Sequence, residues 1–197
     1  MVVAGTTLIV DKDKAKNLFN LKLRNLKWIL AGLLILGGIT SYIKLRSELN
    51  YRESIFFKER KEYSLMLNKL DLVSDIFYPF DGSKQPVDYY RGIANYYLRN
   101  YKENLSIVLH AGELAPYNPI ILNNIGAAYE AMNDFERAIK NLEKVKIYFP
   151  NYIKPQFNLL RLYHSTGKKD KANVLLEELI TKLPDNSSLL KFKNRIQ

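Results

Sequence analysis

The chain has 197 residues and a net charge of +10, from 30 Lys and Arg against 20 Asp and Glu, and it contains no cysteine. The lack of cysteine excludes disulfides, thiolate metal sites and a lipid-modified cysteine. Nucleic-acid binding is not indicated, because residues 1–46 hold eight basic and two acidic residues, whereas residues 47–197 hold 22 and 18. The surplus therefore gathers beside the apolar segment described below, where basic residues meet lipid headgroups, and the remainder mixes both signs.

The chain begins with ten apolar or small residues, MVVAGTTLIV, ahead of a charged stretch from Asp11 to Lys16. We assign residues 1–27 to a basic N-terminal segment. Its start has two interpretations: a packed or disordered N-terminus, and the end of an earlier membrane span that has been cut short.

A run of sixteen uncharged residues, WILAGLLILGGITSYI, occupies 28–43 and contains eight Leu or Ile. As a helix it would rise about 24 Å, a little less than a bilayer core of roughly 30 Å. Lys27 and Lys44 flank the run, and Trp28 and Tyr42 stand where interfacial aromatic residues are common. We therefore predict one transmembrane helix. A cleaved signal peptide is disfavoured, because the segment ahead of the run is long for a signal and no small-x-small cleavage site follows it.

The charges on the two sides of the run give a slight preference for its orientation. Five Lys and Arg lie in 13–27 and four lie in 44–58, which favours an N-terminus inside the cell and the rest of the chain on the non-cytoplasmic side. The composition, rich in Lys, Asn, Ile and Tyr, is typical of low-GC bacteria. We expect a single-pass protein of the bacterial inner membrane.

Three prolines, Pro116, Pro150 and Pro184, recur at one constant interval, and the residues between them repeat in register. A fixed period of this length indicates stacked supersecondary units. Each frame carries two apolar stripes with helical spacing, which predicts two amphipathic helices, and the proline ends the second helix. The three frames are 85–118, 119–152 and 153–186.

Turn-forming residues predict where the helices of each frame separate. The expected breaks are at Arg99-Asn100, Asn133-Asp134 and Thr166-Gly167. A degenerate earlier unit and a linker are expected in 44–84. A short capping helix is expected in 187–197, because the last apolar face of a stacked array needs a cover.

The central frame, with Gly126, Tyr129, Ala138 and Pro150, resembles the tetratricopeptide repeat. The resemblance implies an all-α fold, a right-handed solenoid of three to four helical hairpins that follows the transmembrane helix. It also implies binding rather than catalysis. The outer frames depart from the pattern, the first with Asp88, Arg91 and Asn95 and the third with Leu160 and Lys169.

The order of basic segment, apolar span and repeats, with the stretch PVDYYRGIANYYLRNYKENL, is similar to the C-terminal end of O-antigen ligase or polymerase-like membrane proteins. This resemblance implies an accessory part or C-terminal fragment of a polysaccharide transfer protein, with a membrane-embedded glycan-assembly partner. The catalytic membrane part of such a ligase is absent from these residues. Such ligases end in the cytoplasm, which conflicts with the orientation that the charges favour.

The sequence holds no constellation that predicts catalysis. His110 and His164 lack companion ligands at metal spacing, and FDGSKQP lacks the glycine spacing of a phosphate loop. We therefore expect no enzyme activity of its own, no cofactor and no metal site.

A groove on the first helices of the hairpins is the candidate binding site. Six tyrosines fall within 78–101, and tyrosine supplies contact area together with a polar group. In peptide-binding relatives an Asn at the frame position of Asn124 and Asn158 can hold the ligand backbone. The alternative is that the asparagines tie repeat to repeat and the tyrosines fill gaps between helices. The predicted groove residues are Tyr89, Ile93, Tyr96, Asn123, Asn124, Lys154, Phe157, Asn158, Arg161 and His164.

The sequence predicts a membrane-anchored scaffold that holds a protein or peptide in this groove. Tethering at the membrane raises local concentration, so a modest affinity suffices. The ligase-type accessory or fragment is the second hypothesis, and self-assembly through the ends of a short array is the third.

Overall fold

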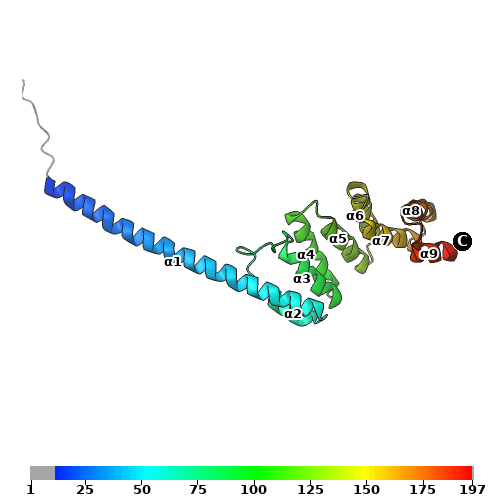
Figure 1. Ribbon diagram of the computed structural model, residues 1–197, viewed down its shortest axis with the longest axis horizontal. Coiled ribbons are helices and arrows are strands. Elements are labelled where there is room, and N and C mark those ends of the chain that lie inside the picture. The colour runs from blue at the N-terminus through cyan, green and yellow to red at the C-terminus, as the bar shows by residue number, and fades with distance from the viewer. Residues whose placement is uncertain (1–11, 197) are drawn as a thin grey trace, which may run out of the picture. The chain divides into compact units, whose positions relative to one another are not determined.

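The computed structural model describes residues 12–196 of the chain, with side chains described for residues 25–194. The interpretations of the first ten residues lie outside this range. The described part is all-helical apart from one isolated bridge between Phe80 and Pro86, which confirms the predicted fold class. Its helices, seen in Figure 1, are α1 (Lys12–Glu59), α2 (Tyr63–Leu70), α3 (Val87–Tyr97), α4 (Tyr101–Leu114), α5 (Pro119–Ala131), α6 (Phe135–Tyr148), α7 (Ile153–Ser165), α8 (Lys169–Lys182) and α9 (Ser187–Ile196).

The chain divides into two units, residues 1–46 and residues 47–197. In the first unit the apolar run 28–43 is helical throughout. Its large side chains, such as Trp28 and Leu34, are exposed. The Asn25–Glu59 part of α1 is long and apolar enough to cross a membrane, a property that a signal sequence near an N-terminus shares.

The second unit is a series of helical hairpins that follows the period of the prolines. The pairs α3–α4, α5–α6 and α7–α8 each contain two antiparallel helices, and equivalent helices in the last two pairs begin exactly one period apart in the chain. Each hairpin turns on one residue with positive φ: Arg99 (63°), Asn133 (60°) and Gly167 (74°). These three residues follow the same period and lie at the breaks that the sequence predicts.

The residues after Arg46 form one further hairpin. Lys61 has φ of 60° and separates the end of α1 from α2. Its distance from Arg99 along the chain exceeds one period by four residues, so the first hairpin is shifted against the others. In the α5–α6 and α7–α8 hairpins, the first helix begins at a fixed interval before the turn residue. The same interval counted back from Lys61 reaches residue 47, so the 47–59 part of α1 takes the place of a first helix. α2 has eight residues, against 14 in α4, α6 and α8.

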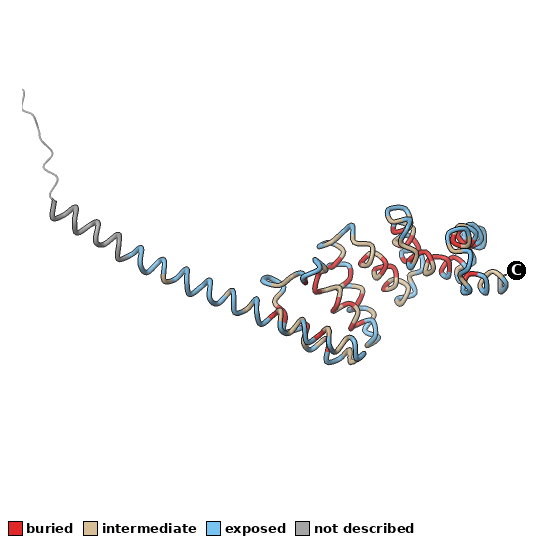
Figure 2. Tube along the Cα trace, viewed as in Figure 1, coloured by how far each residue is buried: buried red, intermediate tan, exposed pale blue. Residues whose placement is uncertain are grey.

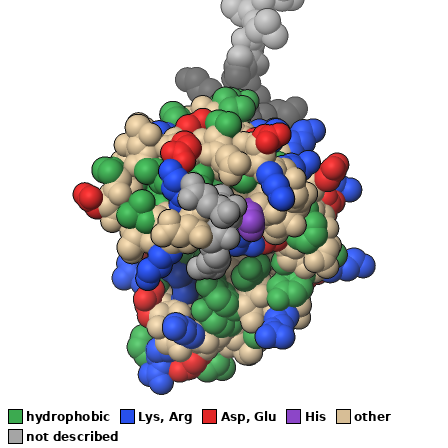
Figure 3. Space-filling model, turned by 90° about the vertical axis from the view of Figure 1, so that its right-hand side faces the viewer, with side chains coloured by type: hydrophobic (Ala, Val, Ile, Leu, Met, Phe, Trp, Pro, Cys, Tyr) green, Lys and Arg blue, Asp and Glu red, His purple; other side chains and the backbone are tan. Residues whose placement is uncertain are grey.

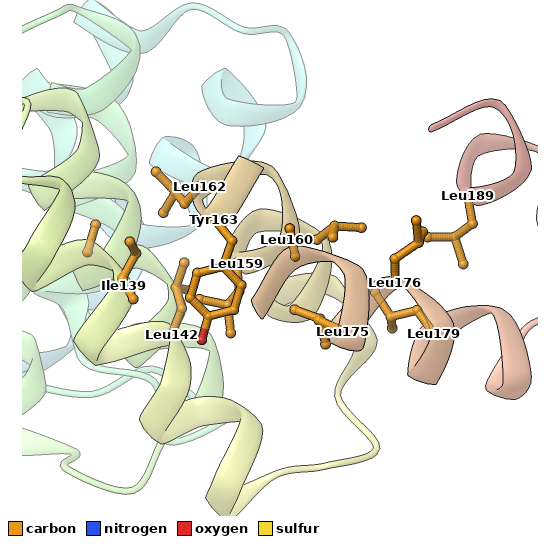
Figure 4. Packing of buried hydrophobic residues seen from close by; sticks show 12 residues of the cluster. Ile139, Leu142, Leu159, Leu160, Leu162, Tyr163, Leu175, Leu176, Leu179 and Leu189 are labelled. Atoms are coloured by element: carbon orange, nitrogen blue, oxygen red, sulfur yellow. The ribbon is translucent and has the colours of Figure 1, made fainter. Parts of the chain in front are cut away.

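The helices within a hairpin approach closely where one of them carries glycine. A Cβ on Gly92 would lie 2.5 Å from Val108 Cγ1, and one on Gly126 would lie 2.9 Å from Leu142 Cγ. In the third hairpin Leu160 takes the glycine's place and is buried in a core cluster that α6, α7, α8 and α9 build together. Figure 4 shows Leu160 and Leu176 in this cluster, with Leu189 of α9 at its edge. Figure 2 shows the buried residues on the facing sides of the helices from α2 to α9.

In the first frame, polar residues that differ from the repeat pattern form a hydrogen-bonded network where an apolar contact is usual. Arg91 on α3 pairs with Asp75 and Asp88, each at 2.6 Å, and its Nη2 donates to the carbonyls of Leu70 and Val73. Burial would lower the pKa of Arg91, but the hydrogen bonds to Asp75 and Asp88 outweigh it and raise the pKa. The guanidinium therefore stays charged and joins α3 to the end of α2.

A second network centres on Asp81 in the connection between α2 and α3. Its carboxylate is buried and accepts hydrogen bonds from the hydroxyl of Tyr51 (2.7 Å), the hydroxyl of Tyr90 (2.6 Å) and the backbone N–H groups of Ser83 and Gln85 (2.8 Å each). Burial would raise the pKa of Asp81, but these hydrogen bonds outweigh it and lower the pKa. The ionised Asp81 thus ties α1, the connection and α3 together.

Candidate functional site

A cavity of about 450 Å³ opens on the first helices of three successive hairpins, α3, α5 and α7, and extends to the end of α1. We refer to it as the repeat cavity. Its lining consists of aromatic, amide and charged side chains with little aliphatic surface. The lining residues are Lys58, Glu59, Lys61, Tyr63, Tyr89, Gly92, Ile93, Tyr96, Tyr97, Asn104, Asn123, Asn124, Ala127, Glu130, Lys154, Asn158 and Arg161.

The structure brings eight of the ten predicted groove residues to the repeat cavity: Tyr89, Ile93, Tyr96, Asn123, Asn124, Lys154, Asn158 and Arg161. It places the other two elsewhere. Phe157 packs against the core cluster of the last hairpin. His164 stacks edge-on against Phe192 of α9, with ring centroids 5.3 Å apart. Both residues belong to the last hairpin, where Phe157 is half-buried and His164 is exposed beside α9.

Tyrosine rings form one wall of the cavity. Tyr63 and Tyr97 stack face to face with centroids 4.3 Å apart, and Tyr96 meets Tyr97 edge-on at 5.7 Å. Tyr96 and Tyr97 remain exposed. Burial raises the pKa of Tyr89 and of Tyr96, and the nearby Glu130 adds to the shift of Tyr96. These phenols are therefore neutral near pH 7 and can donate hydrogen bonds.

Two contacts cross the cavity wall between α5 and α7. Asn158 Nδ2 donates to Asn123 Oδ1 at 3.0 Å, and Arg161 binds Glu130 through both guanidinium nitrogens, with Nη2–Oε2 at 2.7 Å. For Asn158 the structure thus shows the repeat-to-repeat tie that the sequence left open, with Asn123 as its partner. Asn124 forms no side-chain hydrogen bond with any residue that the structure describes, and it lines the cavity.

The cavity carries more positive charge than the sequence indicated, because Lys58 and Lys61 join Lys154 and Arg161. Glu130 neutralises Arg161, and Glu59 lies 3.7 Å from Lys58 Nζ. Lys61 and Lys154 form no ion pair within the described part of the chain. The charge left over is therefore positive and comes from these two lysines.

Asn104 places an unusual group in the lining. Its side chain is buried and its Nδ2 donates to the carbonyl of Gly92 at 2.8 Å, whereas its Oδ1 has no hydrogen-bond partner among the described residues. A buried acceptor without a partner costs about 1–3 kcal/mol. The later frames carry Ala138 and Ala172 at this position. A polar Asn104 where the other frames have alanine was therefore the sequence signal that could have pointed to this group.

The described residues contain no group of three or more His, Asp or Glu side chains placed to hold a metal ion. His110 Nδ1 lies 2.5 Å from the carboxylate of Asp88, outside the repeat cavity. The end-on view in Figure 3 shows Lys, Arg, Asp and Glu side chains interspersed over the face that it presents. The chemistry that this arrangement supports is recognition by hydrogen bonds, aromatic contact and charge.

Comparison with known proteins identifies one of the repeats. Residues 120–146 match the tetratricopeptide repeat family. No relative was found among curated protein sequences. The chain is similar to the solved structure of YrrB, described as a TPR protein with an unusual peptide-binding site: the sequences are 17% identical, the TM-score is 0.64, and 86% of this chain and 89% of that one are covered.

Two further structures show the same fold. MamA from AMB-1 is 18% identical with a TM-score of 0.60, over 74% of this chain and 77% of MamA. The first TPR domain of Spaghetti (RPAP3), solved with an HSP90 peptide bound, is 16% identical with a TM-score of 0.56, over 63% of this chain and 95% of that domain. The chain therefore contains a tetratricopeptide repeat at 120–146 and has the fold of a tetratricopeptide solenoid.

Proposed function

We propose that the repeat cavity binds a peptide or protein segment and that the chain acts as a scaffold at a membrane. One observation carries the proposal: three successive first helices present tyrosine rings, amide groups and positive charge to one cavity of about 450 Å³. Exposed tyrosine and arginine are enriched where proteins bind each other. Two of the similar structures are described as peptide-bound or peptide-binding, which supports the same use here.

The charges indicate what kind of segment fits. Lys61 and Lys154 attract acidic groups, and the stacked Tyr63 and Tyr97 offer a flat apolar surface. Asn124 offers an amide that can bond a ligand backbone. We therefore infer an extended segment that carries at least one carboxylate and one apolar side chain.

We also propose that residues 28–43 cross the bacterial inner membrane once. The exposed apolar side chains of this helix support the proposal, because such a surface is costly in water and favourable in lipid. The charges around the span favour repeats on the non-cytoplasmic side. A reporter enzyme that is active on only one side of the membrane, fused after Gln197, tests the orientation.

Photo-crosslinking in intact cells tests the cavity. Tyr97 in the cavity and Tyr148 at the end of α6 are 58% and 61% exposed, so a photoreactive phenylalanine at either position is a matched pair. We expect an adduct with a specific protein from position 97 and none from position 148, and we expect Lys154→Glu to reduce the first. Equal adduct patterns from both positions would overturn the cavity as the binding site.

The ligase-type accessory or fragment stays a prediction of the sequence. The comparisons returned tetratricopeptide structures, and no contact in the described residues favours a role in glycan transfer over general binding. We therefore advance the scaffold as the function.

A further inference from the structure

The connection between α2 and α3 is longer than the later connections that join a described hairpin to the next helix. It covers 71–86, which is sixteen residues, whereas 115–118, 149–152 and 183–186 have four residues each. It also exposes large apolar side chains. Ile76 is 82% exposed and Leu72 is 53% exposed, and Phe77 and Phe80 are exposed by more than a third. Single exposed apolar residues are normal, but four in one short connection is a concentration of the kind found where proteins meet a partner or a membrane.

Hydrogen bonds hold this connection beside the start of the second unit. The backbone N–H of Ser74 donates to the hydroxyl of Ser47 at 3.0 Å. The ring of Tyr78 lies 5.7 Å from that of Tyr51, whose hydroxyl binds Asp81. α2 runs back along α1, because Lys69 near the end of α2 pairs with Glu53 of α1 at 2.5 Å, and the connection that follows reaches Ser47 through Ser74.

The covalent chain places Ser47 close to the apolar run. It comes only four residues after residue 43, where the run ends, and four residues of chain reach at most about 14 Å. If residues 28–43 cross the membrane, any segment bonded to Ser47 lies near the headgroup region. This limit follows from the chain length alone.

We propose that the 71–86 connection is a membrane-surface contact whose side chains Leu72, Ile76 and Phe77 enter the headgroup region of the bilayer. The proposal rests on the proposed span. It makes the connection a second attachment to the same membrane, and it accounts for both the length and the apolar surface of this segment. Apolar and aromatic side chains are the groups that settle at this depth.

Two of the three carboxylates of the connection have partners within the protein. Asp75 is paired with Arg91 at 2.6 Å, and Asp81 is buried with four hydrogen-bond donors around it. Asp71, beside Leu72, is exposed, so its carboxylate stays on the aqueous side of the headgroups. Lys44 and Arg46, which follow the apolar run, are exposed and add attraction to anionic headgroups.

Depth-dependent fluorescence quenching in vesicles tests this contact on the full chain. Because the sequence has no cysteine, Leu34→Cys, Ile76→Cys and Val174→Cys can each carry a single environment-sensitive fluorophore. Val174 on α8 is a matched control, an apolar residue that is 61% exposed. The vesicles contain phosphatidylcholine, phosphatidylglycerol and lipids that carry a spin-label quencher either near the headgroup or deep in the acyl chain.

We expect the fluorophore at 34 to be quenched by the deep label, the one at 76 to lose most of its emission to the shallow label, and the one at 174 to keep its emission. If the fluorophore at 76 behaves like the one at 174 while the one at 34 is quenched, the surface contact is overturned and the span stands. If the fluorophore at 34 is not quenched, the span itself is overturned. Since the vesicles contain no other protein, quenching at 76 cannot come from a protein partner.

Discussion

Arg161 on α7 and Glu130 on α5 hold each other across two successive repeats, with both guanidinium nitrogens on one carboxylate and Nη2–Oε2 at 2.7 Å. The hydrogen bonds to Glu130 raise the pKa of Arg161, so the pair stays ionised. Both charges line the repeat cavity, where they cancel. The charge that remains for a ligand is therefore that of Lys61 and Lys154.

This cancellation predicts that crosslinking in the cavity responds unequally to two substitutions that replace charged residues with glutamine. Glu130→Gln with Arg161→Gln leaves the net charge of the cavity unchanged, whereas Lys154→Gln removes one positive charge. We expect the crosslink yield from position 97 to fall more with Lys154→Gln than with the double change. Because Arg161 is half exposed, its pair contributes about 1 kcal/mol or less to the free energy of unfolding. Urea unfolding of the double variant checks that the fold is retained, and a larger loss of crosslinking in that variant would contradict the charge assignment.

Asp81 predicts acid sensitivity of the first hairpin. Its pKa is lowered in the folded chain, so its stabilisation is complete above the pKa of an unfolded aspartate, about 3.9. The contribution is lost as the pH falls through the lower, folded pKa. We expect Asp81→Asn to lower the free energy of unfolding by about 3 kcal/mol at pH 7, because it weakens several charge-assisted hydrogen bonds at a buried site. We also expect it to flatten the decline in stability below about pH 4.

Urea unfolding at a series of pH values, followed by circular dichroism, measures both effects. Tyr90→Phe is the matched control, because it removes one donor to Asp81 and keeps the carboxylate. It should cost less than Asp81→Asn and keep the acid slope. An unchanged slope in Asp81→Asn would show that another group titrates.

The contact between Gly92 and Val108 predicts a steric penalty in the first regular hairpin. Gly92→Ala would bring Cβ to 2.5 Å from Val108 Cγ1, and overpacking of this kind costs about 1–3 kcal/mol. Gly82→Ala is the control, because no atom lies within 4 Å of its added Cβ. In a double-mutant cycle, Gly92→Ala with Val108→Ala should cost less than the sum of the single changes. Additive costs would mean that the helices separate freely.

The turn residue Arg99 predicts a stabilising substitution. Arg99 has φ of 63° and its side chain forms no hydrogen bond or ion pair with the described residues. Gly167 holds the same position in the last hairpin with φ of 74°. We expect Arg99→Gly to raise the free energy of unfolding by up to about 1 kcal/mol and Gly167→Ala to lower it by about 1 kcal/mol. Thermal unfolding measures the stability of both variants. If Arg99→Gly is less stable than the parent protein, the side chain of Arg99 has a role in the turn.

The period of the prolines predicted the regular hairpins well, because prolines, turn residues and small residues all follow the same register. It gave no register for the first hairpin, which the sequence predicts only as a degenerate unit within 44–84, since the Lys61 turn is shifted by four residues and α2 ends early at Leu70. For that reason the cavity residues Lys58, Lys61 and Tyr63 could not be found from the period. No spacing rule could have assigned them to a groove.

The frame positions predicted which residues of α3, α5 and α7 face the cavity, but not how they are bonded. By its frame position Arg161 is predicted to be a cation that faces the groove. In the structure it is paired with Glu130 of the preceding repeat. In the sequence Asp81 looks like a linker residue. Its role could not be predicted, because its partners Tyr51 and Tyr90 come from helices that only the folded chain brings together. Phe157 fits the frame as well, but it is half-buried and packs against the core cluster of the last hairpin.

The bonds around Ser47 and Tyr51 also define how the repeats would carry a mechanical load. A pull on the residues before Ser47 enters the solenoid along α1, where Ser47 bonds Ser74 and Tyr51 bonds Asp81. These bonds, with the buried Met66 and Leu70 beneath them, would have to shear before α1 left the first hairpin. The array would then transmit tension to the hairpins that line the repeat cavity, rather than losing its first helix to the pull.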